Sequence, residues 1–396
     1  MNKNHDKSRI SGMLALGLSV LLGLPAFALT KFEQLTSDAE AAYKNRNYPD
    51  AQKFFEMAIK ETDKLEKNDK RVPTTYYNLA LVFQAEANYA EAEKNMTKAL
   101  DMMTVLYGTE HQRVAQVYMD LADLYLEQAG VERDKAPELK KKSAENYKKG
   151  LEIFEKIYSQ ATGQEEGSSD VPQPKEPGKK SDKPTPQSTA ADLSNALRLV
   201  ADFYAEDEIY DQAEPLYKRS LELEDFAAGP DDKDLGKHKA KVAEFYCVQG
   251  KYKLADPLFK DALANAEKNY GVDGVETARI CYNFGGLYYD QGQFGDAEVM
   301  FKRSLKILEK AEDQNEDDLA QKSIALADVL DMQGKNEEST VVYKKAIATL
   351  EKSSDKQVLI RGLKQYQKHL LMQNKKDEAA KIAARIKTLK DATKAQ

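Results

Sequence analysis

Apolar side chains recur in this sequence three and four residues apart, the spacing that places them on one face of an α-helix. In the stretch 76–83, apolar residues occupy the first, fourth, fifth and eighth positions. Three further stretches repeat this arrangement, at 118–125, 197–204 and 281–288. Each stretch therefore predicts an amphipathic helix with one buried side.

A second pattern follows these stretches: a small residue, an aromatic residue four positions later, and another small residue three positions after that. Three copies lie 42 residues apart and begin at Ala213, Ala255 and Ala297. Other copies begin at Ala51, Ala92, Ser143 and Ser339, with Met96 in place of one aromatic residue. A short turn such as that at Gly250 separates the two patterns, and glycine there can end a helix in a left-handed conformation. Pro49, Pro215 and Pro257 are expected in the first turn of the second helix, where a missing N–H group costs little.

The repeated unit is thus helix, turn, helix, and it resembles the tetratricopeptide repeat. The 42-residue spacing and the connector Gly108-x2-His111-x2-Val114-Ala115 look like the long, kinesin-light-chain type of that repeat. The resemblance covers residues 33–388, although Trp is absent and Lys239 occupies one anchor position. It implies an all-α fold, a right-handed α-solenoid of stacked antiparallel helix pairs with about eight units.

Two insertions interrupt the period. Nine extra residues fall near 130–139, and 28 fall in 159–189, which is rich in Pro, Gly, Ser, Lys and Glu and should be disordered because it cannot bury a core. We expect a signal peptide at 1–28, three repeat units in 29–158, a disordered linker or loop at 159–190, and four units plus a capping unit in 191–396. The sequence leaves open whether the stack is continuous across the linker or splits into two blocks.

The first 28 residues differ from the rest of the chain. Lys3, Lys7 and Arg9 precede an apolar run over 13–24, which ends before the small-x-small triplet 26–28. This pattern is typical of a secretory signal peptide cleaved after Ala28, so we expect an exported protein of the periplasm or the cell exterior, typical of a bacterium. An uncleaved anchor is the alternative, but the apolar run is shorter than the roughly 20 residues that span a membrane.

Charge and composition exclude several classes of function. Cleavage would change the formal net charge from −7 to −9, which disfavours non-specific binding of nucleic acid. The histidines at 111, 238 and 369 lack metal-ligand spacing, and no phosphate loop or nucleophile elbow occurs. Cys247 and Cys281 could pair in an oxidising compartment, but their expected offset of roughly 12 Å on neighbouring helices exceeds bonding reach. We therefore expect no enzyme activity, no metal and no cofactor.

The resemblance places a concave groove along the free side of the first helices. Acidic residues recur there, directly after the small residue of the first helix and one turn later. They predict an acidic ridge that steers a basic or extended partner, and the alternative is a solvated face neutralised by neighbouring lysines. The ridge comprises Asp123, Glu127, Asp202, Glu206, Glu244, Asp290 and Asp328.

An aromatic-Asn pair is the second candidate feature of the groove. It occurs as Tyr77-Asn78 and again as Tyr282-Asn283. In the tetratricopeptide-repeat proteins that this sequence resembles, Asn on the first helix can form hydrogen bonds to the backbone of a bound peptide, because an amide both donates and accepts. An Asn that packs between helices or faces solvent is the commoner alternative.

These features favour a non-catalytic scaffold that binds a protein or peptide in the groove and has no membrane span after cleavage. A basic partner would suit the acidic ridge. A capture protein for a cationic peptide or small ligand is one alternative. An accessory subunit of an enzyme complex is another. The partner and the oligomeric state are not encoded in any motif, because many functions share one fold.

Overall fold

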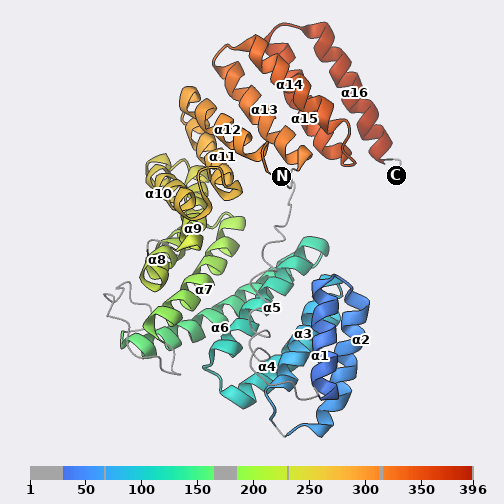
Figure 1. The fold of residues 1–396 in the computed structure, drawn as a ribbon, viewed down its shortest axis with the longest axis vertical. Helices are drawn as coiled ribbons and strands as arrows, with labels where there is room; N and C mark the ends of the chain where they lie inside the picture. The colour runs from blue at the N-terminus through green and yellow to red at the C-terminus, as the bar shows by residue number, and fades with distance from the viewer. Residues whose placement is uncertain (1–29, 67, 165–184, 230–231, 312–314, 395–396) are drawn as a thin grey trace. The chain divides into compact units, whose positions relative to one another are not determined.

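The computed structural model describes residues 30–66, 68–164, 185–229, 232–311 and 315–394. Within these residues the chain forms sixteen α-helices and no strand (Figure 1). In chain order the helices are α1 (Lys31–Lys44), α2 (Tyr48–Glu61), α3 (Arg71–Ala85), α4 (Tyr89–Tyr107), α5 (Gln112–Val131), α6 (Ala136–Thr162), α7 (Pro186–Glu206), α8 (Tyr210–Ala228), α9 (Lys233–Val248), α10 (Tyr252–Tyr270), α11 (Val275–Asp290), α12 (Phe294–Leu308), α13 (Glu316–Met332), α14 (Asn336–Leu350), α15 (Lys356–Met372) and α16 (Lys376–Lys394).

Neighbouring helices pack in pairs, and each pair packs on the next. Helix α1 contacts α2, α3 contacts α4 and α5 contacts α6, while α2 packs on α3 and α4 on α5. The same alternation runs from α9 to α16. The predicted all-α stack of helix pairs is therefore confirmed.

The chain divides into two compact units, unit 1 (Met1–Leu223) and unit 2 (Glu224–Gln396). The predicted linker 159–190 falls within unit 1, and its residues 165–184 lie outside the described part. Helices α6 and α7 on its two sides pack against each other. Arg219 of α8 also forms a bidentate ion pair with Glu155 of α6, with N–O distances of 2.5 and 2.8 Å. The stack is thus continuous from α6 to α7, and the assignment of 29–158 and 191–396 as repeat blocks stays a prediction.

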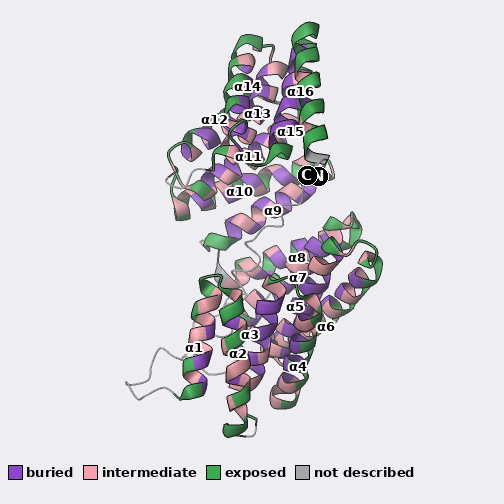
Figure 2. Cartoon of the chain, turned by 90° about the vertical axis from the view of Figure 1, so that its right-hand side faces the viewer, coloured by how far each residue is buried: buried purple, intermediate pink, exposed green. Residues whose placement is uncertain are grey.

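The repeated small and aromatic residues form the core. The small anchors Ala51, Ala255 and Ser339 are fully buried, and the large anchors Tyr147 and Phe259 are at most 2% exposed. Figure 2 shows buried residues in purple on the sides where neighbouring helices meet. A small residue lets the two helix backbones approach, and the aromatic ring one turn later fills the space beside it.

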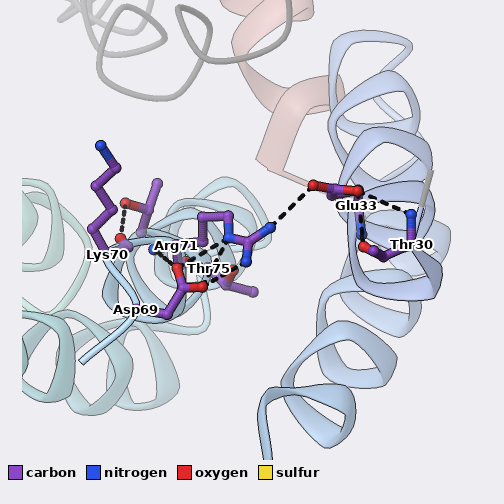
Figure 3. A network of polar contacts seen from close by, with 7 residues as sticks. Thr30, Glu33, Asp69, Lys70, Arg71 and Thr75 are labelled. Atoms are coloured by element: carbon purple, nitrogen blue, oxygen red, sulfur yellow. Dashed lines mark hydrogen bonds and ion pairs between the residues drawn. The ribbon is translucent and has the colours of Figure 1, made fainter. Parts of the chain in front are cut away.

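An ion pair connects the first turn of α1 to the start of α3 (Figure 3). The guanidinium of Arg71 donates to Glu33 of α1 at 3.0 Å and to Asp69, just before α3, at 3.0 and 2.5 Å. The hydrogen bonds from Arg71 to Asp69 hold the pKa of Asp69 below its usual value. Glu33 in turn completes a capping box with Thr30, the N-cap of α1.

In every helix pair except α5 and α6, the turn between the two helices carries one residue with positive φ. Glycine occupies that position between α9 and α10, α11 and α12, and α13 and α14, as predicted at Gly250. Arg46, Ala87, Glu208 and Asn374 occupy it in other pairs. Pro49 lies in the first turn of α2, as predicted. Pro215 and Pro257 lie inside α8 and α10, so the prediction of a first-turn position is wrong for them: each helix begins a turn earlier, at a tyrosine.

Replacing Ala87 by glycine is expected to raise the free energy of unfolding by about 0.5–1 kcal/mol, because a left-handed conformation strains a residue that has a Cβ atom. The reverse change, Gly292→Ala at φ 72°, should lower it by a similar amount. Urea unfolding followed by circular dichroism measures both. Two changes of the same sign would contradict the strain argument.

Candidate binding face

Three of the predicted ridge residues face the interior of a helix pair. Asp123 and Asp202 are buried and accept hydrogen bonds from the phenols of Tyr147 and Tyr217, the latter at 2.5 Å. Asp328 is half-buried and accepts from Tyr343 in the same way. In each case the aspartate follows the small anchor of the first helix, and the tyrosine is the large anchor of the second helix.

Other helix pairs of the same chain show why these residues occur together. Where the large anchor is Phe55, Met96, Phe259 or Phe301, the position after the small anchor holds Glu40, Leu81, Glu244 or Gly286. Aspartate is thus present only where the second helix supplies a phenol that can donate to it. The Asp–Tyr bond joins the two helices of a pair, and a ligand-binding role of these aspartates stays a prediction.

In unit 2, the predicted residues of α9 and α11 contact each other. The Asn283 amide donates to Glu244, and Arg279 Nη1 lies 3.8 Å from the same carboxylate. Burial raises the pKa of Glu244, and the Arg279 charge opposes this rise. Tyr282 packs on Phe301 with ring centres 5.1 Å apart, under the ammonium of Lys322. Asp290 is exposed at the end of α11.

In unit 1, Tyr77 is buried, and its hydroxyl donates to Asp120 of α5 at 2.7 Å. Gln116 donates to the other oxygen of Asp120 at 3.0 Å. Burial nevertheless raises the pKa of Asp120 to about 7. Sequence reasoning missed Asp120, although it occupies the position equivalent to Asn78, two residues before the small anchor.

Two of the remaining candidates of unit 1, Asn78 and Glu127, have few partners among the described residues. Glu127 is half-buried and accepts from the Gln84 amide at 2.9 Å. Asn78 is half-buried and has no side-chain hydrogen bond within the described part of the chain. Glu206 is exposed at the end of α7. Sequence reasoning also missed Glu40, which follows the small residue Ala39 as Asp123 follows Ala122 and whose pKa is raised by burial.

The cysteine and histidine side chains of unit 2 are buried or half-buried in the fold. Cys247 and Cys281 are free thiols, and burial raises their pKa values to about 12 and about 11. The ring of His369 lies 2.7 Å from Asp331, and His238 pairs with Glu224. Over the residues that the structure describes, no group of three His, Cys, Asp or Glu side chains could hold a metal ion. None of the helices in this described part of the chain is long and apolar enough to cross a membrane.

Two parts of the chain match the family model described as tetratricopeptide repeat, at residues 71–132 and 236–310. These ranges hold α3 to α5 and most of α9 to α12. Each unit therefore contains a segment that matches this repeat. No curated protein matches it.

Solved structures share the fold. The apo form of RapI is 13% identical with a TM-score of 0.60, over 90% of this chain and 85% of that chain. The apo form of the quorum sensor NprR from B. thuringiensis is 12% identical with a TM-score of 0.56, over 96% and 91%. A signal transduction ATPase with a tetratricopeptide repeat sensor, from Pyrococcus horikoshii, is 15% identical with a TM-score of 0.58, over 90% and 47%. At these identities the likeness concerns the fold alone.

Proposed function

Because the chain carries tetratricopeptide repeats, we propose that it is a non-catalytic scaffold that binds an extended protein segment on the first helices of unit 1. The proposal includes the type of repeat, which is the long, 42-residue, kinesin-light-chain-like one. The protein acts outside the cytoplasm, after cleavage of residues 1–28. One solved chain with this fold is described as a quorum sensor, which agrees with a role in recognition.

The observation that carries the proposal is the unused bonding capacity of α3 and α5. Asn78 offers an amide donor and acceptor without a partner in the described chain, and Glu127 offers a half-buried carboxylate bonded only by Gln84. Water can bond these half-buried groups in the free chain, and a bound segment would replace that water with hydrogen bonds of its own. An extended backbone presents the N–H and C=O groups that suit Asn78.

Two features support export. The apolar run and small-x-small triplet of residues 13–28 are typical of a cleaved signal. Helix α1 begins at Lys31 with its capping box on Thr30, so cleavage after Ala28 leaves the observed start of the fold intact. Cell fractionation with an antibody to the chain tests the location, and a cytoplasmic, uncleaved product would contradict it.

The binding proposal is tested by affinity capture with residues 29–396 from the extracytoplasmic fraction of the native cell. The parent is compared with the variant Asn78→Ala, Glu127→Gln. The control is Asn146→Ala, Glu152→Gln on the second helix α6. A partner kept by the parent and the control but reduced at least tenfold by the first variant supports the proposal. Equal recovery on all three would move the binding surface away from α3 and α5.

A further inference from the structure

An unsatisfied acceptor lies beside the carboxylate of Glu127. The Gln84 amide donates to Glu127 Oε2 through Nε2 at 2.9 Å, while its Oε1 is buried and has no hydrogen-bond partner. The two heteroatoms of one amide are roughly 2.2 Å apart, from the lengths of its C=O and C–N bonds. Gln84 and Glu127 therefore present two neighbouring acceptors that lack a common donor.

No cation of the described chain fills this position. With the residues that the structure describes, half-buried Glu127 forms no ion pair. Gln84 lies in the last turn of α3, where the helix carbonyls add partial negative charge. A donor with several N–H groups and a positive charge would satisfy both side chains at once.

Unit 2 contains another Gln–Glu pair, at a different place in the repeat, that also contacts lysine. The Gln333 amide donates to Glu298 at 2.9 Å, and the ammonium groups of Lys302 and Lys335 lie 2.5 and 2.7 Å from that carboxylate. Burial alone would raise the pKa of Glu298, but the hydrogen bonds from these three residues lower it to about 2. A Gln–Glu pair of this kind is thus stabilised in this chain by lysine. In unit 1 the pair is present and the lysine is missing.

Tyrosines near Glu127 suit the rest of a lysine side chain. The charge of Glu127 contributes to raising the pKa values of Tyr43 and Tyr89, although burial contributes more. The rings of Tyr43 and Tyr48 are 5.6 Å apart, and all three tyrosines are half-buried. Elsewhere in the chain lysine covers a tyrosine ring, as Lys98 does on Tyr76 at 4.0 Å. None of the cation–π contacts among the described residues uses Tyr43, Tyr48 or Tyr89.

We propose that Glu127 and Gln84, with the neighbouring Tyr43 and Tyr89, bind the ammonium group of a lysine residue in the partner segment. This site deepens the proposed function and rests on it. The lysine of the partner segment would supply to Glu127 the positive charge that Lys302 and Lys335 of this chain supply to Glu298. Asn78, on the same helix as Gln84, would bond the backbone of the same segment.

The test uses two fluorescein-labelled nonapeptides of Gly, Ser and Ala that differ only at the central residue, which is lysine or the uncharged norleucine. Fluorescence anisotropy with residues 29–396 should show the lysine peptide bound at least tenfold more tightly. Glu127→Gln keeps the bond to Gln84 but removes the charge, and should abolish this preference. Gln84→Leu should reduce it several-fold. Equal binding of both peptides by the parent would overturn the site.

Two controls separate this site from the general function. Glu132→Gln changes a nearby carboxylate that already pairs with Lys135 at 2.7 Å, so the lysine preference should persist. Thermal unfolding must show that each variant is folded. In the capture experiment, Asn78→Ala and Glu127→Gln are then tested separately. Loss of the partner with the first and full retention with the second would leave the scaffold function standing and reject the lysine site.

Discussion

Replacement of Phe259 by alanine is expected to lower the free energy of unfolding of unit 2 by about 3–5 kcal/mol. Phe259 is the large anchor of α10 and is 0% exposed. Its ring stacks on Phe284 of the next pair with ring centres 5.4 Å apart, and Phe284 stacks on Tyr288 at 4.6 Å. Truncation therefore removes contacts between pairs, and it leaves a cavity that fixed helices cannot close.

Guanidinium unfolding followed by circular dichroism at 222 nm measures this effect, since the chain has no tryptophan. Val299→Ala on α12 is the control, because Val299 is 59% exposed and should change stability by no more than about 0.5 kcal/mol. Each repeat contacts only its neighbours, so the loss should be confined to unit 2. A loss below about 1 kcal/mol would show that the anchor does not hold the stack.

The sequence predicts the stack because its repeated residues are the ones that the fold buries. Ala255, Phe259 and Ala262 are all 0% exposed, and their copies in other pairs are buried too. The starts of the second helices α10, α12 and α14 are less predictable than those of α2 and α4. Lys251, Gln293 and Lys335 are N-caps without a capping side-chain bond, whereas Asn47 and Asn88 cap α2 and α4. Without a capping residue, the early start of α10 that places Pro257 inside the helix carries no sequence signal.

The candidate face was harder to predict, because a helical period shows which residues share a side but not what lies opposite. Asp123 and Glu127 share one side of α5, yet the first meets the Tyr147 phenol and the second meets an amide of another pair. The Asp–Tyr pairs leave a trace in the sequence, since aspartate occurs after the small anchor only where the large anchor is tyrosine. The Gln84–Glu127 pair leaves none, because Gln84 lies outside the repeated pattern.

The stability of unit 1 is expected to fall as the pH rises from about 4 to about 7, through Asp120. Burial raises the pKa of Asp120 from 3.8 to about 7, while hydrogen bonds from Tyr77 and Gln116 oppose the rise and the Asp123 charge adds to it. The folded state therefore keeps the proton over a range in which the unfolded chain has lost it. The stabilisation by this group is complete below the unfolded pKa and is lost as the pH rises through the folded pKa. A shift of three units corresponds to about 4 kcal/mol at most.

Asp120→Asn isolates this contribution. Asparagine still accepts from Tyr77, and the Gln116 amide can turn to accept from it, so the variant should match the parent near pH 4. Near pH 8 it should be more stable by about 2–4 kcal/mol, because the parent then buries a charge and the variant does not.

Urea unfolding at several pH values measures the difference between parent and variant. Asp101→Asn, on the exposed side of α4, is the control. A constant difference for Asp120→Asn would mean that the pKa of Asp120 is the same in the folded and the unfolded chain. The Tyr77 and Gln116 hydrogen bonds would then balance the cost of burial, and Asp120 would make no pH-dependent contribution to the stability of unit 1.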